Sequence, residues 1–190
     1  MPMDDRQRLR KLLVERSVRL GDFTLASGAR SSYYVDARRT TMSAEGQYLT
    51  GRVCLAALQA SGLQPTHVGG LTMGADPVSY AMARESFAQG APMDGFSVRK
   101  TAKEHGTGQR VEGGLPTDAQ CLVVEDSMTT GGSALKAIEA LEEYGATVVG
   151  VLTLVDREEG GREKLEAAGY PLIAVYSGKE LLEEAGRERG

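Results

Sequence analysis

The chain has 190 residues, of which 41% are hydrophobic and 25% charged, so it is long enough to bury a sizeable core in one compact domain. Its formal net charge is -4 and its sequence pI about 5.3, which argues against attraction of the whole protein to nucleic acid or anionic lipid. An anionic ligand would have to be captured by a local group of residues.

The cysteines and the N-terminus exclude several classes of protein. Cys54 and Cys121 lie far apart within apolar runs and lack the spacing of a CxxC pair or a zinc site, so we interpret both as buried small residues. The segment MPMDDRQRLRKLL is charged and lacks the apolar core of a secretion signal, and no apolar run is long enough to cross a bilayer. These features predict a cytoplasmic protein that binds neither membrane nor nucleic acid.

Apolar periodicity and turn residues predict an alternation of strands and helices after an N-terminal helix and hairpin. The expected elements, in chain order, are a helix at 4–16, a β-hairpin at 23–38, a helix at 44–61, a strand at 67–71, a helix at 77–87, strands at 95–98 and 120–124, a helix at 132–144, a strand at 147–155, a helix at 162–168 and a strand at 172–176. Residues 101–117 are rich in glycine and poor in apolar residues, which predicts a long loop.

The strands predict an α/β fold with an open, mainly parallel sheet flanked by helices. Runs such as CLVV and VVGVLTLV are apolar at successive positions rather than alternate ones, as burial on both faces requires. Ligands of such sheets bind outside the carboxyl ends of the strands, so the loops that follow the strands are the first places to search for a site.

An acidic pair and a hydroxyl-rich glycine loop follow the strand at 120–124. Glu125 and Asp126 precede Ser127, Met128, Thr129, Thr130, Gly131, Gly132 and Ser133. Backbone N–H groups at a helix start bind phosphate, whereas two carboxylates would repel it and suit sugar hydroxyls or a hydrated divalent cation. The alternative is that these residues only form a turn and cap the following helix. The string contains neither GxGxxG nor GxxxxGK[ST], which argues against a dinucleotide site and a P-loop.

A basic segment precedes the long loop and extends into it. Arg99, Lys100, Lys103 and His105 could together clamp a diphosphate, and nearby glycines would let the loop close over it. The alternative is a solvated surface loop. His67 opens an apolar strand, and we interpret it as structural.

Two of these strings resemble one family. The string LVVEDSMTTGGS at 122–133 is similar to the motif of type I phosphoribosyltransferases that binds 5-phosphoribosyl 1-diphosphate (PRPP), and VRKTAKEHGTG at 98–108 resembles the catalytic loop of orotate phosphoribosyltransferases. The resemblance implies a single domain over 1–190, with residues 1–40 contributing a small N-terminal hood. It also implies transfer of the phosphoribosyl group from PRPP to orotate, giving orotidine 5'-monophosphate and diphosphate in UMP biosynthesis.

The resemblance also implies residue roles. Lys103 and His105 would be catalytic. Together with Arg99, Lys100 and residues 125–133 they would bind PRPP. Thr129 and Arg157 would bind orotate, and Mg²⁺ would be held mainly through PRPP and water, with no direct protein ligand. The family is homodimeric and shares its catalytic loop between subunits.

Several positions remain open or depart from the family. A planar guanidinium suits a carboxylate, but Arg157 could equally be a helix-capping surface arginine. Ala26 and Gly74 stand where some members carry lysines, and Asp76 has no assigned role. The alternative functions are a purine or uracil phosphoribosyltransferase, or a regulator that senses PRPP and binds nucleic acid.

Overall fold

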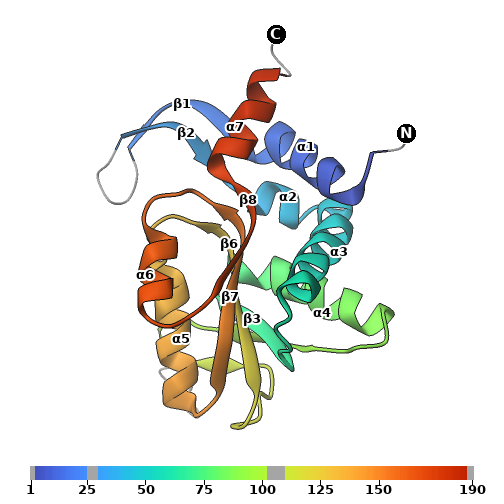
Figure 1. Ribbon diagram of the computed structural model, residues 1–190, viewed down its shortest axis with the longest axis vertical. Helices are drawn as coiled ribbons and strands as arrows, with labels where there is room; N and C mark the ends of the chain where they lie inside the picture. The colour runs from blue at the N-terminus through green and yellow to red at the C-terminus, as the bar shows by residue number, and fades with distance from the viewer. Residues whose placement is uncertain (1–2, 25–29, 102–109, 188–190) are drawn as a thin grey trace.

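A six-stranded sheet forms the centre of the computed structural model, which describes residues 3–24, 30–101 and 110–187 (Figure 1). Its strands are β3 (His67–Leu71), β4 (Asp94–Val98), β5 (Val111–Glu112), β6 (Gln120–Met128), β7 (Thr147–Asp156) and β8 (Leu172–Ser177). They lie in the order β5-β4-β3-β6-β7-β8, and every pair is parallel except β4 with β5. The predicted α/β class with a mainly parallel sheet is confirmed.

Helices cover both faces of this sheet. They are α1 (Asp5–Ser17), α2 (Arg38–Thr41), α3 (Ala44–Ser61), α4 (Ala75–Ala88), α5 (Gly132–Tyr144), α6 (Gly161–Ala167) and α7 (Gly178–Arg187). In Figure 1, α5 and α6 lie on one side of the sheet, and α3 and α4 lie on the other. Leu122 and Val124 point into the core under α3 and α4, whereas Cys121 and Val123 point into the core under α5. Burial on both faces therefore accounts for the continuous apolar run in β6.

The N-terminal hairpin is a separate two-stranded sheet of β1 (Val18–Thr24) and β2 (Arg30–Val35), which pair antiparallel. The hairpin was predicted, but β1 begins five residues before the predicted boundary because α1 passes directly into it at Val18. Phe23 packs against Tyr34 across the hairpin, with ring centroids 5.7 Å apart. The two strands project from the body of the molecule (Figure 1).

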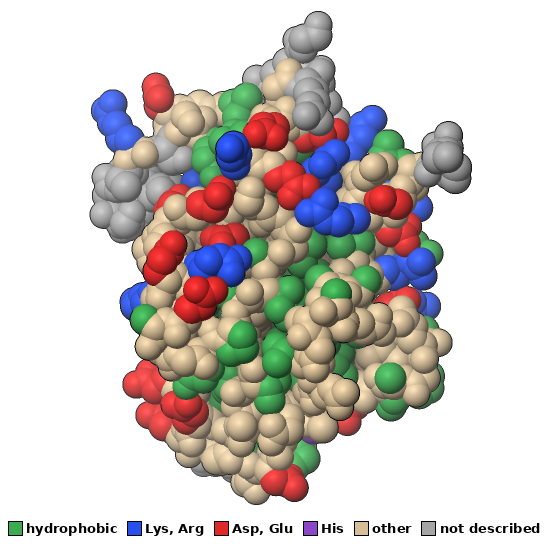
Figure 2. All heavy atoms as spheres, in the orientation of Figure 1, with side chains coloured by type: hydrophobic (Ala, Val, Ile, Leu, Met, Phe, Trp, Pro, Cys, Tyr) green, Lys and Arg blue, Asp and Glu red, His purple; other side chains and the backbone are tan. Residues whose placement is uncertain are grey.

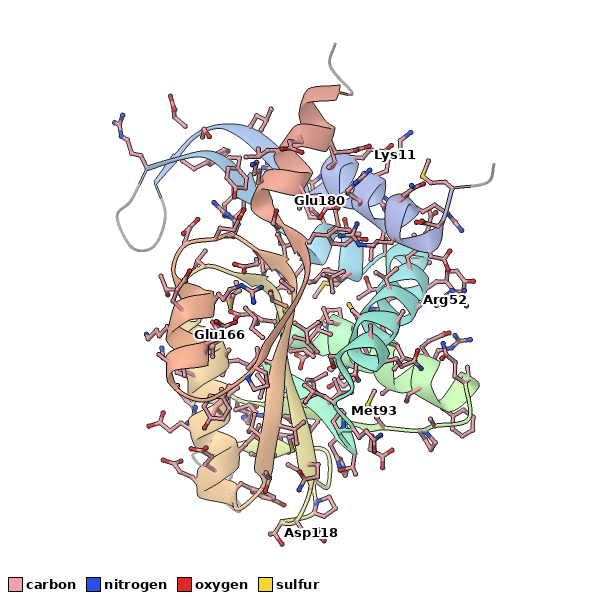
Figure 3. All side chains as sticks on the ribbon, in the orientation of Figure 1. Lys11, Arg52, Met93, Asp118, Glu166 and Glu180 are labelled. Atoms are coloured by element: carbon pink, nitrogen blue, oxygen red, sulfur yellow. The ribbon has the colours of Figure 1, made fainter. Side chains whose placement is uncertain are left out.

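Helix α7, which was not among the elements expected from the sequence, packs beside α1. Leu181 and Ala185 are buried in the same core as Leu9 and Leu13. Ion pairs also join the two helices. Arg6 and Arg10 both pair with Glu180, which Figure 3 labels on α7, and Arg10 also pairs with Glu184 at 3.0 Å. No helix in the described ranges combines the length and apolar character needed to span a membrane.

Two boundaries differ from prediction near the expected site. Strand β6 continues four residues beyond Val124, because β7 offers a hydrogen-bonding partner as far as Asp156. The acidic pair thus lies inside the end of a strand rather than in the loop after it. Within the predicted long loop, Val111–Glu112 form the short strand β5 against β4, because the chain turns back along that edge of the sheet.

Candidate active site

A cavity of about 860 Å³ opens at the carboxyl ends of β3, β6 and β7, beside the end of the N-terminal hairpin. This is where an open α/β sheet is expected to bind its ligand. The predicted site residues in its wall are Lys100, Glu125, Asp126, Ser127, Thr129, Thr130, Ser133 and Arg157. Segments that are far apart in the sequence therefore meet in one cavity.

The other predicted site residues lie elsewhere or are not described. The Met128 side chain is buried in the core, and its carbonyl accepts a hydrogen bond from the Arg157 backbone N–H. Arg99 forms an ion pair with Glu112 at 3.5 Å. Gly131 and Gly132 form the start of α5 behind the cavity wall. Lys103 and His105 lie outside the described residues, so their roles stay predictions.

Burial of the acidic pair changes its electrostatics. Burial, assisted by the charge of Asp126, raises the pKa of Glu125 from 4.5 to about 7, while a hydrogen bond from Ser133 opposes the shift. Burial also raises the pKa of Asp126, opposed by the Ser127 N–H and by the charge of Arg38. Glu125 Oε2 is buried and has no hydrogen-bond partner among the described protein groups. An acceptor in this state is suited to a hydroxyl donor from a ligand.

The glycine loop ends at an uncapped helix N-terminus. Gly131 is the N-cap of α5, and no side chain of the described chain caps the first turn. The first N–H groups of α5 therefore remain available to an anion, and the helix dipole favours negative charge there. Thr129, Thr130 and Ser133 surround this position with hydroxyl groups.

The two glycines of this loop serve different purposes. Gly131 has φ 71°, in the left-handed region, and a Cβ on it would lie 3.3 Å from the Gly161 carbonyl oxygen. A Cβ on Gly132 would meet only the Thr130 hydroxyl, at 3.7 Å. We expect Gly131→Ala to reduce the free energy of unfolding by about 1 to 2 kcal/mol, and Gly132→Ala to change it by less than about 0.5 kcal/mol. Urea denaturation of the two variants measures the difference, and equal losses would contradict this assignment.

Gly74 provides space for the Asp126 carboxylate. A Cβ at position 74 would lie 2.4 Å from Asp126 Oδ1, although the backbone there is ordinary right-handed helical. Any side chain at position 74 must therefore displace the carboxylate from the position it has in this structure.

We expect Gly74→Ala to weaken PRPP binding by about tenfold with little loss of stability, because one charge-assisted hydrogen bond would be misplaced. Titration calorimetry with PRPP measures the effect. Gly186→Ala is the control, since a Cβ there meets nothing within 4 Å. Unchanged affinity in Gly74→Ala would show that Asp126 does not contact the donor.

Arg157 lies in a buried aromatic and acidic setting. Its side chain is 3% exposed, its guanidinium lies 4.1 Å above the Tyr33 ring, and its NH2 group is 3.1 Å from Glu159 Oε1. The same nitrogen donates to the Tyr33 carbonyl oxygen at 3.4 Å. The alternative of a helix-capping surface arginine is therefore wrong.

Asp76, whose role the sequence left open, accepts a hydrogen bond from Ser97 Oγ at 2.7 Å, and Ser97 also bonds to the Tyr80 hydroxyl at 2.7 Å. These contacts join α4 to β4. Sequence reasoning did not select four polar residues of the cavity wall. They are Tyr34, Asp36 and Arg38 near the end of the hairpin, and Glu159 after β7. The charges beside a predicted hairpin end were the only signal for the pair Asp36 and Arg38.

The fold and the cavity define a class: an α/β protein that can hold a sugar phosphate at the carboxyl ends of parallel strands. A model of the phosphoribosyl transferase domain matches residues 54–169. The orotate phosphoribosyltransferase of Aquifex aeolicus is 44% identical over 185 residues, covering 96% of this chain and 100% of that protein. The orotate phosphoribosyltransferase of Streptomyces avermitilis is 49% identical over 181 residues, covering 94% and 98%.

Structural comparison agrees with the sequence relatives. The crystal structure of Mycobacterium tuberculosis orotate phosphoribosyltransferase in complex with PRPP superposes with a TM-score of 0.76 at 39% identity, covering 94% of this chain and 99% of that one. The chain belongs to the orotate phosphoribosyltransferase family.

Proposed function

We propose that this chain transfers the 5-phosphoribosyl group of PRPP to N1 of orotate, forming orotidine 5'-monophosphate and diphosphate in UMP biosynthesis. The observation that carries the proposal is that a single cavity contains both the acidic pair with its phosphate loop and the guanidinium of Arg157. The first set suits a phosphorylated sugar, and Arg157 suits the carboxylate that distinguishes orotate from uracil. The M. tuberculosis relative, crystallised with PRPP, supports the choice of donor.

The reaction needs no protein nucleophile. The bond between ribose C1 and the diphosphate oxygen breaks and the diphosphate keeps the electron pair, while orotate N1 bonds to C1 and releases its proton to the departing diphosphate or to water. Glu125 and Asp126 would hold the ribose hydroxyls, and their negative charge would favour the positive character that develops at C1. Lys100 lines the cavity of its own chain. Lys103 and His105 are proposed to stabilise the departing diphosphate across a homodimer that shares the loop, with Arg99 assisting.

Mg²⁺ is proposed to bind mainly through PRPP and water. The described residues contain no group of three or more His, Cys, Asp or Glu side chains placed to hold a metal ion. The neighbouring carboxylates of Glu125 and Asp126 fit a hydrated cation, because they can accept hydrogen bonds from its water ligands. The bound ion would neutralise charge on the leaving diphosphate.

The remaining assignments follow from the family and the surface. We propose that residues 1–190 form one cytoplasmic domain, with residues 1–40 contributing the hood, and that it binds small molecules rather than nucleic acid or membrane. On the face shown in Figure 2, acidic and basic side chains of the described residues are interspersed, which is unlike the basic face that nucleic acid requires.

The test is an assay with PRPP, Mg²⁺ and a panel of orotate, uracil, adenine and hypoxanthine that follows diphosphate release. Release that depends on orotate is the expected result. Release with uracil or a purine alone would replace the proposal with one of its nearest alternatives. No release with any base, together with PRPP-dependent binding of nucleic acid, would favour a regulator.

A further inference from the structure

Arg38 is a cation in the cavity wall that the mechanism above does not use. It begins α2, shortly after the N-terminal hairpin, and its Nε donates to Asp36 Oδ1 at 2.9 Å. Its side chain is 44% exposed, and both residues line the cavity. The bond through Nε restrains the guanidinium. Its terminal nitrogens are the donors with which arginine binds phosphate oxygens in pairs.

The charges of the cavity show why such a cation is needed. Its described wall carries four carboxylates, from Asp36, Glu125, Asp126 and Glu159, against three cations, from Arg38, Lys100 and Arg157. Arg157 is buried and paired with Glu159. Among the described wall residues, Arg38 and Lys100 are therefore the cations with exposed side chains, and a ligand bearing a diphosphate requires compensation of its charge.

The surroundings of Arg38 indicate which part of such a ligand it reaches. The charge of Arg38 lowers the pKa of Asp126. Arg38 therefore lies near the carboxylates that suit ribose hydroxyls rather than among the hydroxyls of the glycine loop. On another side of Asp126, position 74 is a glycine and supplies no cation, and a Cβ there would lie 2.4 Å from the carboxylate. A cation beside Asp126 must therefore come from elsewhere, and Arg38 is in place.

We propose that Arg38, held by Asp36, binds the diphosphate of PRPP. The inference rests on the proposed function for the identity of the donor, and it adds a binding residue from the hood. A hood residue that contacts the donor would also couple the position of the hood to PRPP binding.

The test compares Arg38→Ala and Arg38→Lys with Arg39→Ala, which removes an exposed arginine next in the chain that does not line the cavity. Titration calorimetry with Mg²⁺ and either PRPP or inorganic diphosphate, without any base, measures binding. We expect Arg38→Ala to weaken the binding of both ligands by about tenfold and Arg38→Lys to weaken it less. Arg39→Ala should leave both affinities unchanged. In the steady state, the KM for PRPP should rise and the KM for orotate at saturating PRPP should not.

Other results would overturn the inference. These are unchanged binding of PRPP and diphosphate in Arg38→Ala, an equal loss in Arg39→Ala, or a rise confined to the KM for orotate. Because the calorimetry contains no base, it decides the role of Arg38 even if the base panel refutes orotate. Thermal unfolding followed by circular dichroism checks that each variant is folded.

Discussion

Replacing Arg157 by alanine is expected to lower kcat/KM for orotate by at least about 100-fold while changing the KM for PRPP little. A bidentate contact between guanidinium and carboxylate provides two charge-assisted hydrogen bonds of about 1.5 to 3 kcal/mol each, and about 2.8 kcal/mol corresponds to 100-fold. The guanidinium is already oriented by the Tyr33 ring and by Glu159, so substrate binding need not order a mobile side chain. Initial rates at varied orotate and saturating PRPP measure the effect.

The same substitution has a structural cost that must be separated from its kinetic effect. It leaves the Glu159 carboxylate, which is 28% exposed, without its cation and opens space above Tyr33. We expect the free energy of unfolding to fall by about 1 to 3 kcal/mol, less than for a fully buried pair, because water still reaches Glu159. Urea denaturation of the same preparations gives this value.

Arg157→Lys is the matched control for charge. Lysine keeps a cation but lacks the planar guanidinium and stacks poorly on Tyr33. Compared with Arg157→Ala, this variant should therefore regain more of the free energy of unfolding than of kcat/KM for orotate. Two results would contradict a role in orotate binding. One is a rise in the KM for PRPP as large as the effect on orotate, and the other is full activity in Arg157→Lys. Uracil, which lacks the carboxylate, should show no comparable dependence on residue 157.

The strands of the core could be predicted because both of their faces are buried. In β6, neighbouring residues such as Leu122 and Val123 enter opposite cores, and a run of apolar residues at successive positions is the direct sequence record of that burial. The end of β6 could not be predicted in the same way. Acidic residues disfavour strands, and hydrogen bonding to β7 extends the strand through Glu125 and Asp126 regardless.

The site was predictable where its chemistry lies in one contiguous string. The glycine loop is local, since the strand end, the glycines and the helix start follow one another between residues 125 and 133. The state of Arg157 depends on Tyr33, which lies 124 residues away, and the space at Gly74, before α4, is filled by the Asp126 carboxylate from β6. Sequence reasoning could list both positions, but their surroundings arise only from the packing of the hood and β3 against β6 and β7.

The ionisation of Glu125 leads to the second large effect, a pH dependence that combines stability with ligand binding. Its pKa in the folded protein, about 7, exceeds its ordinary value of 4.5, so the folded state holds the proton more tightly than the unfolded state. The resulting stabilisation is fully present below pH 4.5 and is lost as the pH rises through about 7. A shift of this size corresponds to a loss on the order of 3 kcal/mol.

Glu125→Gln removes the titrating group and keeps a similar shape. We expect its free energy of unfolding to change less steeply than that of the natural protein between about pH 5 and pH 8, so that the variant gains relative stability as the pH rises. Urea unfolding at several pH values measures both slopes without any ligand. Identical slopes would show that Glu125 titrates normally in the fold.

PRPP binding should depend on pH in the opposite direction. If ribose hydroxyls donate to Glu125, the ligand binds the ionised carboxylate, so affinity should increase as the pH rises toward 7 and complex formation should release a proton. Calorimetry in buffers of different ionisation enthalpy counts that proton. Since the phosphates of PRPP titrate in the same range, Glu125→Gln provides the correction. Its binding should be weaker at pH 8, and the pH dependence that remains belongs to the ligand. Equal proton release by both proteins would place the ribose away from Glu125, leaving Asp126 as its partner in the acidic pair.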